Sequence, residues 1–202
     1  EDKIAYQWFN QKEEQNNIST ANPDSTNFRE ILKTRMLDLT VDWQESDLIT
    51  LLQKPNPVSK TGFYTLNPDG GGLKKLLEEY GITLNWQKEQ GKFLYSFTEY
   101  NGKNLKLFLY DNLSQKKQDL NLATLAEKCV MDASQALIIC AAPKNIDSVL
   151  ILPDDWLKNK FESEDEIWQI DLNTSEKKLL LSPVQKFDVS EIILTSDNKN
   201  LF

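Results

Sequence analysis

The strongest constraint on the fold of this chain is an internal repeat. The stretch "NISTANPDSTNFREILKT" (17–34) aligns with "GFYTLNPDGGGLKKLLEE" (62–79), so that Asn-Pro-Asp recurs 45 residues later along the chain. A second pattern, a tryptophan followed by polar residues and an apolar run, starts at Val41 and again at Leu84, and weaker copies start at Cys129 and Ile192. A fixed period of this length indicates an array of similar supersecondary units.

Each unit contains three or four short apolar or alternating stretches, separated by Asn, Asp, Pro, Gly and Ser. Such stretches are typical of β-strands joined by tight turns, and four strands in about 45 residues are typical of a propeller blade. We therefore predict an all-β fold, a β-propeller of four-stranded antiparallel blades, with about four blades in this segment. Full units start near Met36, Tyr80 and Leu125, and partial units start near Lys3 and Val184. The blades either close on themselves or belong to a larger propeller.

The three glycines at 70–72 allow another interpretation, a loop that cradles a phosphate before a helix. Leu73, Leu76 and Leu77 fit the spacing of a helical face. However, the aligned copy at 25–27 has no glycine, and no Gly-x-x-x-x-Gly-Lys-Ser/Thr pattern occurs. Because Gly70 tolerates positive φ directly after an Asn-Pro-Asp turn, the sequence favours the tip of a hairpin here.

The repeat resembles a known family. "GFYTLNPDGGGLKKLL" is similar to the TolB-type β-propeller repeat, and "LNWQKEQGKFLYSF" and "IILTSDNKNLF" are similar to the Trp-Ser-Pro-Asp-Gly-Lys segment of that family. The similarity extends over nearly the whole chain except residues 146–165. The resemblance implies that residues 1–202 form a single TolB-like propeller domain or a propeller segment. It implies a fold and leaves the function open.

The composition excludes several functions. The net charge is −8, which makes a nucleic-acid backbone an unsuitable partner, since binding to it depends on Lys and Arg. No apolar run approaches the roughly 20 residues of a membrane-spanning helix, so we expect no membrane insertion. The chain has no histidine, and this excludes catalysis by a Ser-His-Asp triad or a Cys-His pair and most kinds of zinc site. We predict no catalytic residue, no metal and no cofactor.

The two cysteines lie in neighbouring apolar runs that would form one hairpin around residues 133–135. If Met131 faces Ala136, then Cys129 faces Ile138 and not Cys140. Disulfide geometry is demanding, so we expect two small buried thiols. The acidic run at 162–166 is interpreted as a solvated loop that leads into a strand.

Residues 145–165 interrupt the third full blade and are predicted to be an insertion loop. Insertions in repeat proteins often lie on the binding face. This one is rich in apolar residues, which could either pack on the parent domain or form an exposed patch for a partner. The candidate partner contacts are Leu150, Trp156, Leu157 and Phe161.

These observations together predict a non-enzymatic, acidic β-propeller module that binds or scaffolds a protein partner. We expect it in an extracytoplasmic bacterial setting, the periplasm or the cell surface. One alternative is an accessory propeller domain of a hydrolase or peptidase whose catalytic domain lies outside this segment. Another is a structural subunit of a surface assembly that self-associates through open blade edges.

Overall fold

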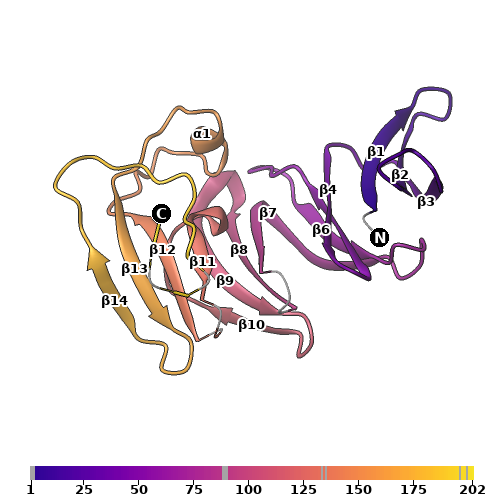
Figure 1. The fold of residues 1–202 in the computed structure, drawn as a ribbon. Coiled ribbons are helices and arrows are strands. Elements are labelled where there is room, and N and C mark those ends of the chain that lie inside the picture. Colours follow the sequence, from indigo (N-terminus) through magenta and orange to yellow (C-terminus); the bar gives the residue numbers. More distant parts are fainter. Residues whose placement is uncertain (1–2, 88–90, 133, 135, 196, 199) are drawn as a thin grey trace. The chain divides into compact units, whose positions relative to one another are not determined.

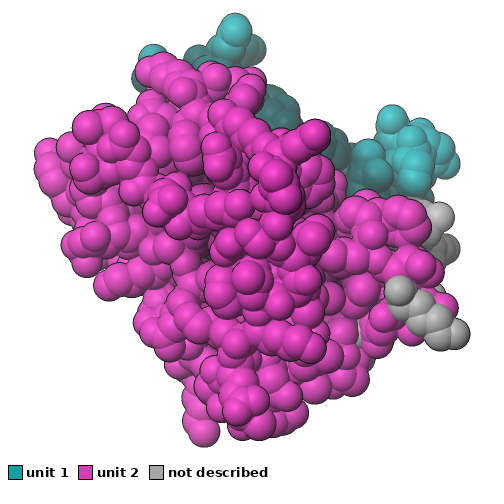
Figure 2. Space-filling view, turned by 90° about the vertical axis from the view of Figure 1, so that its left-hand side faces the viewer, with its two compact units in different colours: residues 1–54, 61–78 teal, residues 55–60, 79–202 magenta. Residues whose placement is uncertain are grey.

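The computed structural model describes residues 3–87, 91–132, 134, 136–195, 197–198 and 200–202 of the chain. Its elements are mostly antiparallel β-strands, and the only α-helix among the described residues is the short α1 (Asp154–Leu157) (Figure 1). The chain divides into two compact units, which Figure 2 colours separately. Unit 1 contains residues 1–54 and 61–78, and unit 2 contains residues 55–60 and 79–202.

Unit 1 is built from two antiparallel groups of strands. The first is β1 (Ile4–Asn10), β2 (Gln15–Ala21) and β3 (Arg29–Thr34). The second is β4 (Leu39–Glu45), β5 (Leu48–Gln53), β6 (Thr61–Leu66) and the first part of β7 (Lys74–Gln87). Isoleucine and leucine side chains from these strands form one buried cluster, namely Ile18, Ile31, Ile49, Leu51 and Leu66.

Unit 2 contains two further groups of strands in the same order. The later part of β7 pairs with β8 (Lys92–Glu99), which pairs with β9 (Lys103–Asp111) and then β10 (Lys116–Asp119). The second group is β11 (Cys129–Met131), β12 (Leu137–Pro143), β13 (Asp165–Asp171) and β14 (Lys177–Leu181). Leucines of β8 and β9 and the apolar side chains of β11–β13 share one core, which includes Leu94, Leu107, Leu120, Met131, Ile138 and Ile170.

The strand order confirms the predicted all-β fold of four-stranded antiparallel blades. Among the described residues the strands form sheets of three (β1–β3), seven (β4–β10) and four strands (β11–β14), and the seven-stranded sheet comprises two four-stranded groups, β4–β7 and β7–β10, that share β7. Strand β7 takes part in two groups, since its first residues belong to unit 1 and its later residues to unit 2. At the end of the chain, a bridge between Leu194 and Leu201 forms a small hairpin where a partial unit was predicted.

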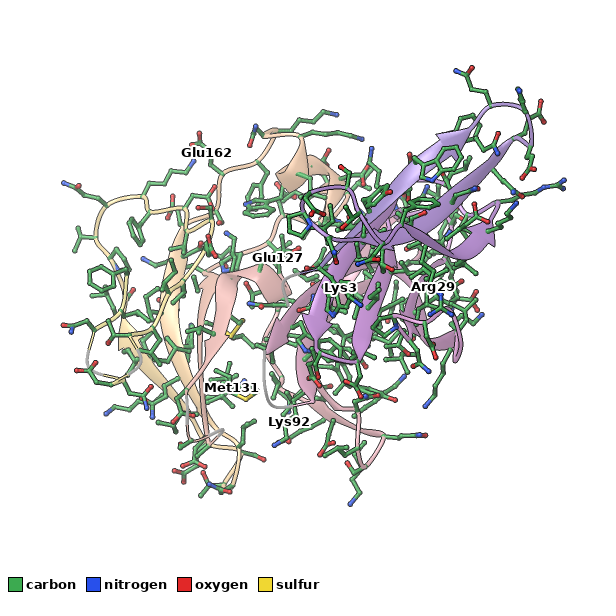
Figure 3. The ribbon with its side chains drawn as sticks, turned by 45° about the vertical axis from the view of Figure 1, so that its right-hand side comes forward. Lys3, Arg29, Lys92, Glu127, Met131 and Glu162 are labelled. Atoms are coloured by element: carbon green, nitrogen blue, oxygen red, sulfur yellow. A yellow bond between two sulfur atoms is a disulfide. The ribbon has the colours of Figure 1, made fainter. Side chains whose placement is uncertain are left out.

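The register of the β11–β12 hairpin differs from the predicted one. Cys129 faces Cys140, and the two form a disulfide, so the expectation of two free thiols is wrong. Figure 3 draws this bond in yellow. Met131 faces Ile138 and not Ala136.

The physical reason for the different register is the side chain of Asp132. Its Oδ1 accepts hydrogen bonds from the backbone N–H groups of Ala136 (3.0 Å) and Leu137 (2.8 Å). These bonds hold Ala136 in the loop, so β12 starts at Leu137. Because pairing in an antiparallel ladder fixes every later partner, this loop determines that the two cysteines are opposite each other.

The glycines at 70–72 lie in the turn of a hairpin, between β6 and β7. The N–H of Asn67 donates to the carbonyl of Gly71, and the N–H of Gly70 donates to the carbonyl of Asn67, both at 2.9 Å. Gly70 has φ of +91°, and a Cβ on it would lie 2.8 Å from the carbonyl oxygen of Ile31. A strand follows the glycines, as the hairpin interpretation predicts.

We expect Gly70→Ala to lower the free energy of unfolding by about 1–2 kcal/mol, because the new Cβ meets both left-handed strain and the Ile31 carbonyl. Gly71→Ala is the matched control, since a Cβ there would make only an ordinary 3.5 Å contact with Asp69, and it should change stability by less than about 0.5 kcal/mol. Urea unfolding of the two variants measures the difference. Equal stability of both variants would contradict this account of the turn.

Candidate functional site

The insertion segment (residues 145–165) connects β12 to β13, ends at the first residue of β13, Asp165, and is held by local hydrogen bonds. It contains α1, and the Asp155 carboxylate accepts the Ile151 N–H at 2.8 Å. Asp147 accepts the Val149 N–H at 3.0 Å. The N–H of Leu152 donates to the carbonyl of Gly102, just before β9. These local bonds give the segment a defined path over unit 2.

The insertion segment ends in a buried ion network centred on Lys128. The Lys128 ammonium donates to Ser163 Oγ (2.7 Å), Asp165 Oδ2 (2.9 Å) and Asp188 Oδ1 (2.8 Å). Only 2% of the Lys128 side chain and none of the Asp165 side chain is exposed. The Trp156 ring covers the ammonium, with its centroid 4.8 Å from Nζ. A lysine has three N–H donors, and all three are satisfied here.

The network joins three parts of the chain that are distant in sequence. Lys128 comes directly before β11, Ser163 and Asp165 end the insertion segment, and Asp188 follows β14. Ser163 Oγ also donates to Asp188 Oδ1 at 2.6 Å. Asp165 Oδ2 further accepts the Val189 N–H at 2.9 Å. The network therefore fixes the end of the insertion segment against unit 2.

Ser163 and Lys128 have the atoms of a nucleophile and a base, but their surroundings do not suit catalysis. Lys128 Nζ donates a hydrogen bond to Ser163 Oγ, so it is the donor of this pair, and the Ser163 hydroxyl donates instead to Asp188. Ser163 is fully buried, so a substrate could not reach its hydroxyl. The arrangement is suited to structural support.

Two acidic side chains of this region, Asp188 and Glu127, have shifted pKa values. Partial burial on its own raises the pKa of Asp188, but hydrogen bonds from Lys128 and Ser163 and the charge of Lys128 outweigh it and hold the pKa below its usual value. Burial raises the pKa of Glu127, and a hydrogen bond with Thr83 opposes the rise only partly. Glu127, labelled in Figure 3, lies directly before Lys128 in the chain.

The sequence analysis missed this network. The acidic run at 162–166 was interpreted as a solvated loop, which is wrong for Asp165, because its side chain is buried beside Lys128. One signal was present: the charged residues Glu127 and Lys128 lie within the otherwise apolar stretch "LAEKCVM". Its partners could not be identified, because they lie 35 to 60 residues further along the chain.

We expect Lys128→Met to lower the free energy of unfolding by about 3–5 kcal/mol, since it leaves the Asp165 carboxylate buried without its counter-charge. Lys160→Met is the control, because Lys160 makes only an exposed 3.7 Å pair with Asp155 and should cost under about 1 kcal/mol. Urea unfolding followed by tryptophan fluorescence gives both values. A Lys128 variant as stable as the Lys160 variant would show that the network contributes nothing.

A groove of about 500 Å³ lies beside the insertion segment. Its floor is the start of β9, and its walls are Ala123 on one side and part of the insertion segment on the other. A second hollow of about 290 Å³ shares Leu105, Lys106 and Ala123 with the first and continues along residues 119–122. We call the two together the edge groove. Its lining is formed by Glu99, 102–106, 119, 121–123, 146–148, Leu150 and Leu152.

Lysine and carboxylate side chains shape the edge groove. Lys103 Nζ donates to the carbonyl oxygens of Ser148 and Leu150, both at 2.7 Å, and so attaches the wall to the floor. Glu99 accepts a hydrogen bond from Asn104 at 2.7 Å, which lowers the pKa of its carboxyl group. Lys106 lies 3.5 Å from the same carboxylate.

The four predicted partner contacts have different surroundings. Leu150 and Trp156 are half-buried and pack against the cluster of Leu105, Leu125 and Leu152. Phe161 is also half-buried and lines a small hollow together with Trp156. Leu157 is 49% exposed. Leu150 alone of the four lines the edge groove, and the exposed Val149 beside it was not among the predicted contacts.

Across the described ranges, no three Cys, Asp or Glu side chains are grouped so that they could hold a metal ion. Within the same residues, no helix is long and apolar enough to cross a membrane.

The sequence matches no protein-family model, and no curated protein is similar to it in sequence. Solved structures do match. TolB from Acinetobacter baumannii has a TM-score of 0.58 at 13% identity, over 98% of this chain and 46% of that chain. The β-propeller domain of the Trilobed protease from Pyrococcus furiosus has a TM-score of 0.54 at 13% identity, over 91% of this chain and 54% of that chain. This chain has a TolB-like β-propeller fold.

The matched proteins differ in activity. They include oligogalacturonate lyases and, with a TM-score of 0.57 and 14% identity, the acylaminoacyl peptidase of Pyrococcus horikoshii. The TolB-like chain spans about half the length of TolB and of the lyases, and its match covers 31% of the peptidase. At these identities the likeness establishes the fold, and the activity has to be argued from the residues of the chain.

Proposed function

We propose that this TolB-like propeller is a non-enzymatic module that binds or scaffolds a protein partner through the insertion segment and the edge groove. One observation carries the proposal. The insertion segment is fixed by the buried Lys128 network, and yet Val149 (75% exposed) and Leu157 (49% exposed) project into solvent from it. A surface that is rigid before contact loses little conformational entropy on binding, and exposed apolar side chains gain free energy when they are covered.

The non-enzymatic part of the proposal rests on the side chains that are present. The chain has no histidine, and in the described part of the chain the hydrogen-bonded pair of Ser163 and Lys128 is buried, with the lysine between two carboxylates. An extracytoplasmic location is supported by the disulfide between Cys129 and Cys140, because disulfides persist in oxidising compartments. A bacterial periplasm or cell surface is the setting that the TolB-type repeat implies.

The test is site-specific photo-crosslinking of the native protein in an extract of its source cells. A photoreactive phenylalanine analogue replaces Val149 in one variant and Leu157 in another. We expect both to capture the same protein, because the two side chains belong to one contact surface. Excess unlabelled chain should compete for this capture.

The matched control carries the same analogue at Leu113, which is 88% exposed in the loop between β9 and β10, away from the insertion segment. It should capture none of the shared partner. Equal capture at all three positions, or no adduct at Val149 and Leu157, would contradict the proposed contact surface.

A second candidate function is favoured by the match to acylaminoacyl peptidase. That match covers 94% of this chain but only 31% of the peptidase. If the TolB-like chain is an accessory propeller of a hydrolase, a nucleophile on a Gly-x-Ser-x-Gly turn has to come from a native chain longer than these 202 residues. Labelling of the native protein by a fluorophosphonate would favour this function over the binding module.

Self-association through a blade edge is a third proposal, and β14 supports it. All five residues of β14 are exposed, including Leu179, Leu180 and Leu181. Its partner is β13 on one side, and no described strand pairs with the other side. An exposed apolar edge strand is a template for pairing with another chain.

We expect the mass of the protein in analytical ultracentrifugation to rise with concentration, and Leu180→Lys to weaken this association by about tenfold, because a charged residue opposes edge pairing. Val184→Lys is the control, since Val184 is fully exposed but lies outside β14. A protein that stays monomeric at every concentration would refute association through β14.

A further inference from the structure

The chain contains three copies of the acceptor motif for N-linked glycans, an asparagine followed by any residue except proline and then by serine or threonine. The three asparagines are Asn17, Asn112 and Asn173. The motif alone does not distinguish among them, because a glycan also requires that the asparagine lies on a surface loop of a secreted protein. The structure places the three side chains in different surroundings, and these surroundings select two of them.

Asn17 is unsuitable as an acceptor. It lies in β2, the central strand of the sheet β1–β3, where its backbone pairs with Trp8 on one side and Lys33 on the other. Only 1% of Asn17 is exposed, and its side-chain amide donates a hydrogen bond to the Glu30 carboxylate. A glycan is bulky and has to project into solvent. The folded sheet therefore has no room for one on Asn17.

Asn112 and Asn173 lie in equivalent turns of unit 2. Asn112 is in the turn between β9 and β10, and Asn173 is in the turn between β13 and β14, so each turn joins the last two strands of a four-stranded group. Asn173 is exposed, and Asn112 is half-buried next to Leu113, which is 88% exposed. Among the described residues, none accepts a hydrogen bond from the side-chain amide of either asparagine.

The two turns are held in the same way, by an aspartate at their start. The Asp111 carboxylate accepts the N–H groups of the two residues that follow Asn112, at 2.9 and 3.0 Å. The Asp171 carboxylate accepts the N–H groups of Asn173 and Thr174, at 2.8 and 3.0 Å. Aspartate commonly stabilises turns through such bonds. Because the aspartates hold the backbone, the asparagine amides are not needed for the turns and are free to react.

Both turns lie at the end of unit 2 opposite the insertion segment. The insertion segment binds Lys103 at the start of β9 and leads into the start of β13, whereas the turns follow the last residues of these strands, Asp111 and Asp171. Figure 1 shows the two hairpin turns at the lower end of unit 2 and α1 at its upper end. Glycans on these turns would therefore leave the insertion segment uncovered.

We infer that Asn112 and Asn173 are acceptors of N-linked glycans and that Asn17 is not. The reaction forms a bond between the asparagine Nδ2 atom and the anomeric carbon of a sugar that is activated as a diphosphate. The bond from that carbon to the diphosphate oxygen breaks, and the released diphosphate takes the proton that the amide loses. The disulfide between Cys129 and Cys140 agrees with passage through an oxidising compartment.

The test is tandem mass spectrometry of a tryptic digest of the native protein from its source cells. Trypsin places the three asparagines on separate peptides, 13–29, 107–116 and 161–177. We expect hexose or N-acetylhexosamine on the asparagine of peptides 107–116 and 161–177, and none on peptide 13–29. Recovery of the first two peptides in unmodified form only, or equal modification of peptide 13–29, would overturn the inference.

A matched pair of variants at Ser114, produced in the same cells, tests whether the motif directs the modification. Ser114→Ala removes the motif but keeps Asn112, so peptide 107–116 should lose its sugar. Ser114→Thr keeps the motif and should keep the sugar. Modification of peptide 161–177 in the same molecules is the control that each variant reaches the modifying compartment. Sugar that remains on the Ser114→Ala variant would overturn the assignment to N-linked glycosylation.

Discussion

The architecture of unit 2 depends on one buried charge, the ammonium of Lys128. A charged group away from water is strongly destabilising unless its hydrogen bonds are satisfied, and Lys128 has three oxygen partners and an aromatic ring around it. These partners come from the insertion segment and from the chain after β14. Apolar residues in place of every member of the network, unlike the loss of Lys128 alone, could give equal stability, but apolar contacts are not directional. Three directed bonds allow only one path for the end of the insertion segment.

That path determines the shape of the edge groove. The insertion segment is held at its end by Ser163 and Asp165, and near its start by Lys103, which binds the carbonyls of Ser148 and Leu150. Between these attachments, Leu150 and Trp156 pack on the cluster of Leu105, Leu125 and Leu152. Some apolar residues of the segment thus pack on the parent domain, whereas Val149 and Leu157 are exposed.

The sequence predicted the parts of the fold that depend on local chemistry. The strands, the turn at Gly70 and the position of the insertion follow from alternating apolar residues, turn residues and repeat spacing, which neighbouring residues specify. The sequence did not predict the pairing register of the two cysteines. This register depends on which backbone N–H groups donate hydrogen bonds to the Asp132 side chain. The candidate site was predicted only in part for a related reason. The insertion segment indicated where the candidate site lies, but Lys128, Asp165 and Asp188 come together only in the folded chain.

The short β10 has a physical cause in the core. Leu120 directly follows β10 and is only 3% exposed, because its side chain joins the cluster that includes Leu94 and Leu107. To enter this cluster the chain has to leave the edge of β9, and the turn at Asp119 and Asn121 lets it do so, with Asn121 at a positive φ of +50°. Thr124 then donates to the Ala141 carbonyl at 2.6 Å, which directs the chain toward β12. The early end of β10 is therefore a consequence of core packing.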